Sequence, residues 1–280
     1  MRITACELPH EPKALATAWT ALCQHTVQNS SDLVLLPEFA MVEPVWESER
    51  FDAAHWDAAA ALSDAWLQRL GELRATHVVG TRPTTIDGRR FNEGYIWSIA
   101  SGLTPLRRKF FLPTEPGNWE TRWFERGDPA FPEFHAGELS FGLNICTELW
   151  ALETYASYAA GNVQMIMTPR ATGAATTPKW LSAGVVAAVP LRCLVCFVQP
   201  RRPDRCVWRR GLDHQPGRQD SGDHYGRRAI RNYRPRSIGR RCGAPDLPAL
   251  CVQPRKMTGF ATVPGEYRSR LLRPANRFRI

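Results

Sequence analysis

The stretch DLVLLPEF, residues 32–39, decides the fold class because four consecutive apolar residues run directly into a proline and an acid. An unbroken apolar run of this length is typical of a strand that is buried on both faces, as in a parallel sheet covered by helices. Glu38 follows the run, so we expect its carboxylate at the end of a buried strand, where α/β proteins form their sites. The alternative for Glu38 is an exposed loop acid.

Outward from this stretch, strand and helix patterns alternate along the first part of the chain. Apolar residues at helical spacing predict helices from Leu15 to Leu22, from Leu62 to Leu73 and across residues 147–160. Short apolar or alternating runs predict strands at ITACEL (3–8), HVVGT (77–81), NEGYIWSIA (92–100), LSFGLNIC (139–146) and VQMIMTP (163–169). The alternation predicts an α/β fold in which helices cover the sheets.

The totals limit the class of protein. The chain has 280 residues, of which 44% are hydrophobic, enough for a sizeable core. No segment approaches the ~18 uninterrupted apolar residues of a membrane span. The start, MRITACELPHEPK, has acids and a proline where a signal peptide needs an apolar region, so we expect a cytoplasmic protein. In that compartment the eight cysteines are expected to be free thiols.

The net charge of +9 is distributed unevenly, which predicts two regions that meet near Pro190. Residues 1–190 carry a net charge of −6 and residues 191–280 a net charge of +15. We therefore predict an ordered domain over residues 1–189 and an Arg-rich tail over residues 190–280 that is disordered or poorly packed.

The tail suggests two binding functions, and its composition disfavours both. Arginines could bind nucleic acid, but aromatic residues that would stack on bases are sparse among them. Cys193 and Cys196 form a C-x-x-C pair, but neither a second pair nor a suitably spaced histidine pair follows, so we expect no metal.

Cys146 and Lys109 are further candidate functional residues. Cys146 ends a predicted strand and precedes a predicted helix, whose dipole and free N–H groups would favour a thiolate. A buried structural cysteine is the alternative. Lys109 lies in RRKFFLP (107–113), where the apolar residues that follow could draw it inward from an otherwise solvated basic face. No histidine is well placed to activate the thiol, which disfavours a Cys–His protease.

Together these segments resemble the nitrilase, or carbon–nitrogen hydrolase, superfamily. The matching motifs are LVLLPEF around Glu38, RRKFFLP around Lys109 and GLNICTELW around Cys146, and the segment EPGNWETRWFERGD places the family's additional glutamate at Glu120. The likeness covers residues 1 to about 189. It implies a four-layer α-β-β-α sandwich, incomplete at the C-terminus because the tail does not match. It also implies homo-oligomers, an assembly that the altered tail puts in question.

The resemblance implies a Glu–Lys–Cys triad that hydrolyses carbon–nitrogen bonds through a thioester and releases ammonia. Glu38 would be the general base, Cys146 the nucleophile, and Lys109 with a backbone N–H the stabiliser of the oxyanion. Glu120 would orient Lys109 or the substrate; its alternative is a surface acid. The substrate would be a small amide, N-carbamoyl compound or nitrile, with no metal or organic cofactor. CTELW lacks the tryptophan after cysteine that we associate with nitrilases, which favours an amide.

The tail is also consistent with a frameshift near residues 189–190. Reading the implied codons one base out of phase permits RSGAWCVSSNR over residues 190–200 and WIINPDGKIL over residues 212–221, strings that resemble the missing part of the family. Trp208 followed by Arg209 permits only glycine in that frame. The chain could then be an active hydrolase or an inactive remnant of one. A basic nucleic-acid-associated protein is a third alternative, which is less favoured than these two.

Overall fold

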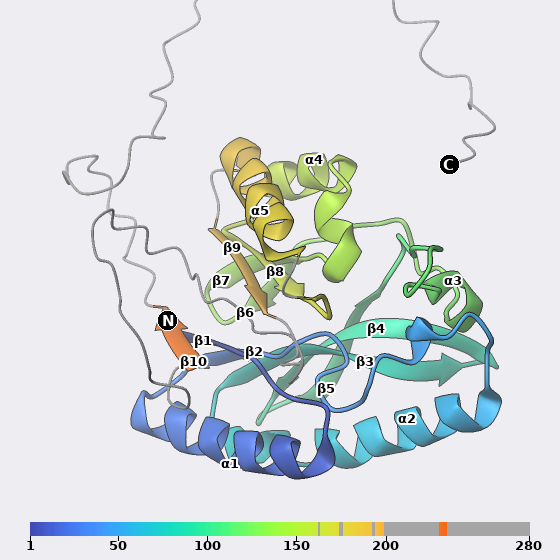
Figure 1. Ribbon diagram of the computed structural model, residues 1–280. Coiled ribbons are helices and arrows are strands. Elements are labelled where there is room, and N and C mark those ends of the chain that lie inside the picture. Colours follow the sequence, from blue (N-terminus) through green and yellow to red (C-terminus); the bar gives the residue numbers. More distant parts are fainter. Residues whose placement is uncertain (162, 174–175, 192–193, 199–229, 234–280) are drawn as a thin grey trace, which may run out of the picture. The chain divides into compact units, whose positions relative to one another are not determined.

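The computed structural model describes residues 1–161, 163–173, 176–191, 194–198 and 230–233 (Figure 1). Most of the predicted tail lies outside these residues, including the second-frame string of residues 212–221 and all but one of the tail's cysteines, and the predictions made for it stay predictions. Within the described residues, no helix is long and apolar enough to cross a membrane.

The first sheet has six strands in the order β10-β1-β2-β3-β4-β5. Strands β1 (Ile3–Cys6), β2 (Leu33–Leu35) and β3 (His77–Ile86) are parallel. Strands β4 (Arg89–Ser98) and β5 (Gly102–Arg108) continue the sheet antiparallel, and β10 (Ile230–Tyr233) pairs antiparallel with β1. The parallel centre confirms the double-sided burial expected of residues 33–36, all of which are fully buried.

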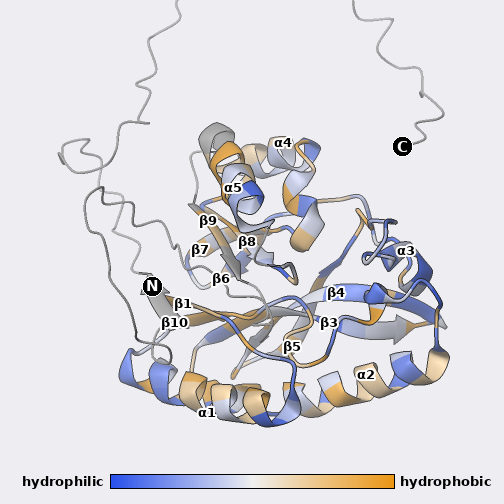
Figure 2. Ribbon diagram, viewed as in Figure 1, coloured by the Kyte–Doolittle hydropathy of each residue, from blue (hydrophilic) through white to orange (hydrophobic). Residues whose placement is uncertain are grey.

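Two long helices, α1 (Pro12–Gln28) and α2 (Ala53–Leu67), cover one face of this sheet (Figure 1). Their apolar faces pack in one cluster with Val34 and Val78, whereas Leu33 and Val79, on the opposite face of the strands, belong to a second cluster. Successive strand residues therefore supply two different cores, as the two-residue period of a strand requires. Figure 2 shows that hydrophobic and hydrophilic residues alternate along both helices.

The second sheet has the order β6-β7-β8-β9, formed by Phe134–Ala136, Leu139–Leu143, Met165–Pro169 and Leu194–Val198. Strands β7, β8 and β9 are parallel, and β6 is antiparallel to β7. Helices α4 (Glu153–Ala160) and α5 (Thr177–Leu191) cover its outer side (Figure 1). The inner side packs on the second cluster, which joins Leu33 and Val79 to residues of β7 and β8. This arrangement confirms the α-β-β-α sandwich.

Strands β9 and β10 lie beyond the boundary predicted near residue 189. Strand β9 comes from LVCFV, an apolar run that extends the second sheet next to β8. The division of the chain at residue 189 stays a prediction.

Several local predictions differ from the structure. The helix expected across residues 147–160 is divided into the 3₁₀ helix η3 (Cys146–Trp150) and α4, and strand β6 was not predicted. The helix expected from Leu62 to Leu73 is divided into α2 and a 3₁₀ turn, η2 (Leu70–Leu73), and Leu62 is exposed because α2 buries its Trp56, Ala59, Ser63 and Leu67 face instead. Strand β5 was not predicted. It contains Pro105, which sheets tolerate at edges, and β5 is the edge strand of the first sheet.

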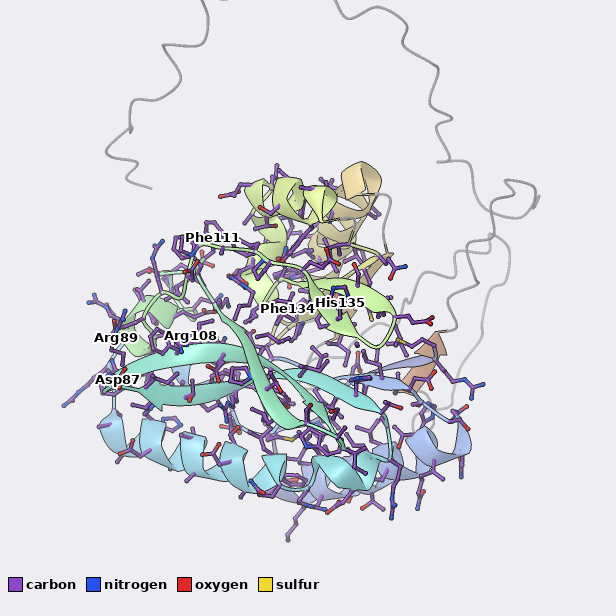
Figure 3. The ribbon with its side chains drawn as sticks, turned by 180° about the vertical axis from the view of Figure 1, so that it is seen from behind. Asp87, Arg89, Arg108, Phe111, Phe134 and His135 are labelled. Carbon is purple, nitrogen blue, oxygen red and sulfur yellow. The ribbon has the colours of Figure 1, made fainter. Side chains whose placement is uncertain are left out.

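The segment DGRR, residues 87–90, contains the turn at the tip of the β3–β4 hairpin (Figure 3). Ile86 pairs with Arg89, and the two residues between them, Asp87 and Gly88, have φ angles of +51° and +72°. Positive φ at both positions is the signature of the two-residue turn that suits the twist of a hairpin.

Candidate active site

Glu38 lies just beyond β2 and is fully buried. The strand's pairing extends one residue further, through the Leu36 N–H and the Val79 carbonyl, and Phe39 then turns away with a φ of +47° while its N–H donates to Thr81 Oγ1. Asn92 Nδ2 donates to Glu38 Oε1 at 2.9 Å. Within the described part of the chain, the other oxygen, Oε2, has no hydrogen-bond partner.

Lys109 follows β5 and directs its ammonium group between two carboxylates. Its Nζ lies 3.0 Å from Glu38 Oε1 and 2.7 Å from Glu120 Oε1, and all three side chains are buried. Glu120 is the first residue of the short helix α3 (Glu120–Trp123). The backbone of Lys109 is held on both sides, by its N–H to the Asn92 carbonyl and by its carbonyl to the Gly127 N–H.

The charges of this cluster do not balance, because one ammonium faces two carboxylates. Burial would lower the pKa of Lys109, but Glu120 and Glu38 outweigh burial and raise it, so the ammonium stays charged. For Glu120, burial raises the pKa to about 8, opposed by Lys109 and assisted by Glu38. The cluster therefore favours a proton on Glu120 near neutral pH.

Cys146 lies three residues beyond β7, at the start of the 3₁₀ helix η3 (Cys146–Trp150). Its φ is +49°, a left-handed backbone conformation that a residue with a side chain rarely adopts. Such outliers cost free energy and cluster at functional sites. The side chain is 4% exposed, and the backbone of Ala171 hydrogen-bonds its sulfur.

The expected thiolate at a helix N-terminus is not what the structure shows. An α-helix does not follow Cys146; a single 3₁₀ turn separates it from α4. Burial raises the pKa of the Cys146 thiol well above its ordinary value, and the negative charge of Glu38 raises it further, with Lys109 opposing. The resting residue is a thiol, so it needs a base to become a nucleophile.

The structure brings the four predicted residues into one site. Glu38, Lys109 and Glu120 are in direct contact, and all three act electrostatically on Cys146. His135, in contrast, is on β6, with 62% of its side chain exposed, and its Nε2 lies 3.1 Å from Glu133 Oε1 (Figure 3).

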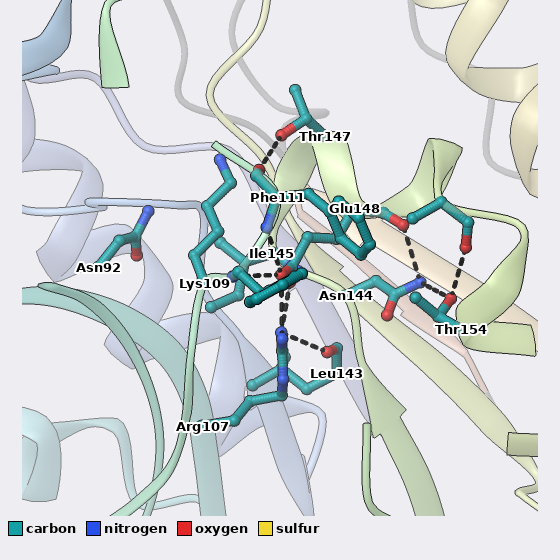
Figure 4. Close-up of polar contacts among 12 residues, drawn as sticks. Asn92, Arg107, Lys109, Phe111, Leu143, Asn144, Ile145, Thr147, Glu148 and Thr154 are labelled. Carbon is teal, nitrogen blue, oxygen red and sulfur yellow. Dashed lines mark hydrogen bonds and ion pairs between the residues drawn. The ribbon is translucent and has the colours of Figure 1, made fainter. Parts of the chain in front are cut away.

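The sequence did not point to a second buried ion pair, which links Glu148 to Arg107 (Figure 4). Glu148 accepts hydrogen bonds from the backbone N–H groups of Ile145 and Phe110, each at 2.8 Å. Strand alternation could have identified Arg107. It and Lys109 have buried side chains, whereas Arg108 between them is 39% exposed.

A comparison with known families now identifies the class of protein. The family model described as "Carbon-nitrogen hydrolase" matches residues 2–226. The chain belongs to this family, and the nitrilase resemblance is confirmed. No curated protein sequence matches the chain at a significant level.

Solved structures share the fold at low sequence identity. A carbon–nitrogen hydrolase from Helicobacter pylori G27 superposes with a TM-score of 0.61 at 17% identity, over 71% of this chain and 73% of that one. A mutant of an amidase of the nitrilase superfamily from Nesterenkonia AN1 gives 0.56 at 18% identity, over 71% and 76%. A glutamine-dependent NAD⁺ synthetase from Acinetobacter baumannii gives 0.59 at 16% identity, over 71% of this chain but 38% of that one.

Proposed function

We propose that the protein is an amidase whose nucleophile is Cys146, with Glu38 as general base and Lys109 as the cation that stabilises the oxyanion. The observation that carries the proposal is the position of Lys109 Nζ, which lies 3.0 Å from Glu38 and 2.7 Å from Glu120. These three groups act electrostatically on Cys146, whose backbone has a strained, left-handed conformation. An acid, a cation and a thiol are the groups that acyl transfer from an amide requires.

In the first half of the reaction, the free oxygen of Glu38 takes the proton of the Cys146 thiol as the sulfur attacks the carbonyl carbon. The carbonyl oxygen becomes an oxyanion, which Lys109 and the backbone N–H of Thr147 stabilise. Glu38 then gives its proton to the nitrogen, the carbon–nitrogen bond breaks, and ammonia leaves a thioester on Cys146.

In the second half, Glu38 removes a proton from water, whose oxygen attacks the thioester carbon. The oxyanion forms again in the same place and collapses, the carbon–sulfur bond breaks, and the thiolate regains its proton from Glu38. The product is a carboxylic acid. Glu120 has a positioning role, because its oxygen at 2.7 Å fixes the ammonium of Lys109.

The choice of an amide over a nitrile rests on two observations. Thr147, rather than tryptophan, follows the cysteine. Two mutants of the Nesterenkonia amidase record acrylamide, one without the cysteine as a complex and one with it as a Michael adduct at the active-site cysteine, so in the latter an amide reaches the thiol. N-carbamoyl compounds belong to the same proposal as a second substrate class.

The test is ammonia release from a panel of amides, N-carbamoyl compounds and nitriles. We expect activity on amides and its loss in Cys146→Ala, which removes the nucleophile and leaves the packing nearly unchanged. Cys23→Ala is the matched control, because Cys23 lies on α1, remote from the site in sequence and only partly buried, and it should keep the wild-type rate. Turnover that survives in Cys146→Ala would refute the mechanism.

The same panel tests the proposed frameshift when it is applied to the 280-residue chain and to a chain whose frame is restored at codon 189–190. Activity in the restored chain alone would identify the present chain as an inactive remnant. If no one-base change there restores an open frame, the frameshift proposal fails. Binding to nucleic acid that weakens steeply with salt would instead support the basic tail as a nucleic-acid contact. A cytoplasmic location and the doubtful homo-oligomer stay predictions.

A further inference from the structure

Asn92 contacts both the proposed base and the segment that carries the proposed cation. It lies on β4, between β3 and β5 in the first sheet, and is 1% exposed. Its side-chain Nδ2 donates to Glu38 Oε1 at 2.9 Å. Its backbone carbonyl accepts the Lys109 N–H at 2.8 Å, which places the two residues side by side (Figure 4). Asn92 thus joins two residues of the proposed mechanism, in which it has no role so far.

An asparagine is an unfavourable residue for this position unless it makes a specific contact. Asparagine is depleted in strands, and a buried side-chain amide costs free energy where its polar atoms are not hydrogen-bonded. Within the described residues, Asn92 Oδ1 has no hydrogen-bond partner, so the amide is held there through Nδ2. The hydrogen bond to Glu38 therefore accounts for an asparagine in the middle of the sheet.

The two carboxylate oxygens of Glu38 differ chemically because of Asn92 and Lys109. Oε1 accepts from Asn92 Nδ2 at 2.9 Å and from Lys109 Nζ at 3.0 Å, and these two donors occupy its two lone pairs. In the part of the chain that the structure describes, Oε2 has no partner. A carboxylate removes a proton with a free lone pair, so Oε2 is the oxygen that can act as the base.

Lys109 by itself would not maintain this difference. The terminal torsion of a glutamate side chain is broad and two-fold, so a carboxylate with a single anchoring donor can rotate and exchange its oxygens. An ammonium has three N–H donors and can follow that rotation or face both oxygens at once. A second donor on a paired strand fixes the plane of the carboxylate and leaves Oε2 free.

We propose that Asn92 is a positioning residue that holds Glu38 Oε1, so that Oε2 stays free to take the proton of the Cys146 thiol. The inference rests on the proposed amidase function and adds a residue to its mechanism. Because Asn92 acts through Glu38, its effect should disappear when Glu38 can no longer act as a base.

The first test measures ammonia release from butyramide, with the rate expressed per mole of reactive Cys146. Asn92→Leu has nearly the same volume and keeps the backbone contact with Lys109, but it lacks the donor. We expect kcat to fall roughly 10- to 100-fold and KM to change little, because the base is misplaced and the substrate is not. Asn29→Leu is the matched control and should keep the wild-type kcat, because Asn29 caps α1 and precedes β2, whereas Glu38 follows β2.

The second test needs no turnover. Iodoacetamide alkylates Cys146 when the sulfur displaces iodide and Glu38 takes the thiol proton, and peptide mass spectrometry measures the rate. We expect Asn92→Leu and Glu38→Gln each to slow alkylation roughly tenfold or more. Adding Asn92→Leu to Glu38→Gln should have no further effect, as expected of residues that act as one unit. A residue that only stabilised the fold would slow alkylation by the same factor in both backgrounds.

The proposal is overturned if Asn92→Leu keeps the wild-type kcat, or if it slows alkylation equally with glutamate and with glutamine at position 38. If Asn92→Leu does not fold, Asn92→Asp decides by the same measurements, because it has the same size and lacks the donor when ionised. Coupling between Asn92 and Glu38 in alkylation without ammonia release would refute the amidase function and leave the positioning role standing.

Discussion

The guanidinium of Arg107 and the carboxylate of Glu148 form a buried ion pair that joins the strand before Lys109 to the turn that carries Cys146. Arg107 Nη2 lies 3.0 Å from Glu148 Oε1, and Arg107 Nη1 donates both to Glu148 Oε2 and to the Leu143 carbonyl (Figure 4). Glu148 also accepts from the N–H groups of Ile145 and Phe110, which adjoin Cys146 and Lys109. The pair thus fixes the nucleophile relative to the oxyanion-stabilising cation.

Glu148→Gln should therefore damage both stability and catalysis. It leaves Arg107 buried without a counter-charge, and we expect the free energy of unfolding to fall by about 3–5 kcal/mol. A small shift of Cys146 against Lys109 should lower kcat/KM by roughly 10- to 100-fold. Urea unfolding and ammonia release measure the two effects.

The control for this variant is Glu125→Gln, which removes the equivalent charge from the exposed Arg89–Glu125 pair. Exposed pairs contribute about 0–1 kcal/mol, so Glu125→Gln should leave both quantities nearly unchanged. Equal losses in the two variants would show that Glu148 has no special role.

The left-handed backbone conformation of Cys146 leads to a prediction about stability that can be tested without an activity assay. At a φ of +49°, glycine is unstrained, whereas alanine pays a cost of about 1–2 kcal/mol. We expect Cys146→Gly to be more stable than Cys146→Ala by about 1 kcal/mol in urea unfolding. Both variants lack the thiol, so the comparison isolates the backbone; an alanine variant as stable as the glycine variant would contradict the strained turn.

The layers of the fold could be predicted from the sequence because they depend on periodic burial. The apolar run at residues 33–36 predicts a strand buried on both faces, and the apolar stripe from Leu15 to Leu22 predicts a helix buried on one face. The structure confirms both predictions. Edge strands have a weaker sequence pattern. In β5, which contains a proline, buried and exposed residues do not alternate regularly, and β6 has only three residues. These elements depend on their neighbours more than on their own residues.

Glu38, Lys109 and Cys146 follow strand ends, which is why the sequence could place them near one another, whereas Glu120 was indicated only by the family resemblance. The contacts between residues far apart in the sequence could not be found in the same way. Asn92 lies within β4 and contacts Glu38 across 54 residues, and Glu148 contacts Arg107 across 41. The raised pKa of Cys146 could not be predicted from the sequence either. It arises from burial and from Glu38, not from the residues next to Cys146 in the chain.

Gly127 makes close backbone contact with the Lys109 segment, so a methyl group there should disturb the site. A Cβ at Gly127 would lie 2.3 Å from the Arg108 carbonyl oxygen, and the Gly127 N–H donates to the Lys109 carbonyl. We expect Gly127→Ala to lower the free energy of unfolding by about 1–3 kcal/mol, because the backbone must shift, and to reduce kcat/KM.

Gly71→Ala is the matched control for Gly127→Ala. A Cβ at Gly71 would meet Trp97 at 3.8 Å, an ordinary contact, and the residue lies in the 3₁₀ turn η2. It should be neutral, or more stable by up to about 1 kcal/mol, because alanine loses less conformational entropy. Activity that falls equally in both variants would argue against a specific effect on Lys109.

The proton on Glu120 predicts how stability depends on pH. Burial raises the pKa of Glu120 to about 8 in the folded protein, whereas the unfolded chain loses this proton near the ordinary value of 4.5. The stabilisation from Glu120 is therefore complete below pH 4.5 and is lost as pH rises toward 8. Its slope is at most about 1.4 kcal/mol per pH unit.

Glu120→Gln isolates this effect, because glutamine is neutral at every pH and can still hydrogen-bond Lys109. The free energy of unfolding of the wild type minus that of Glu120→Gln, measured in urea at pH 5, 6, 7 and 8, should fall steadily over the series. A difference that stayed constant over the series would mean that Lys109 keeps Glu120 ionised in the folded state, because the folded and unfolded states would then both lack the proton.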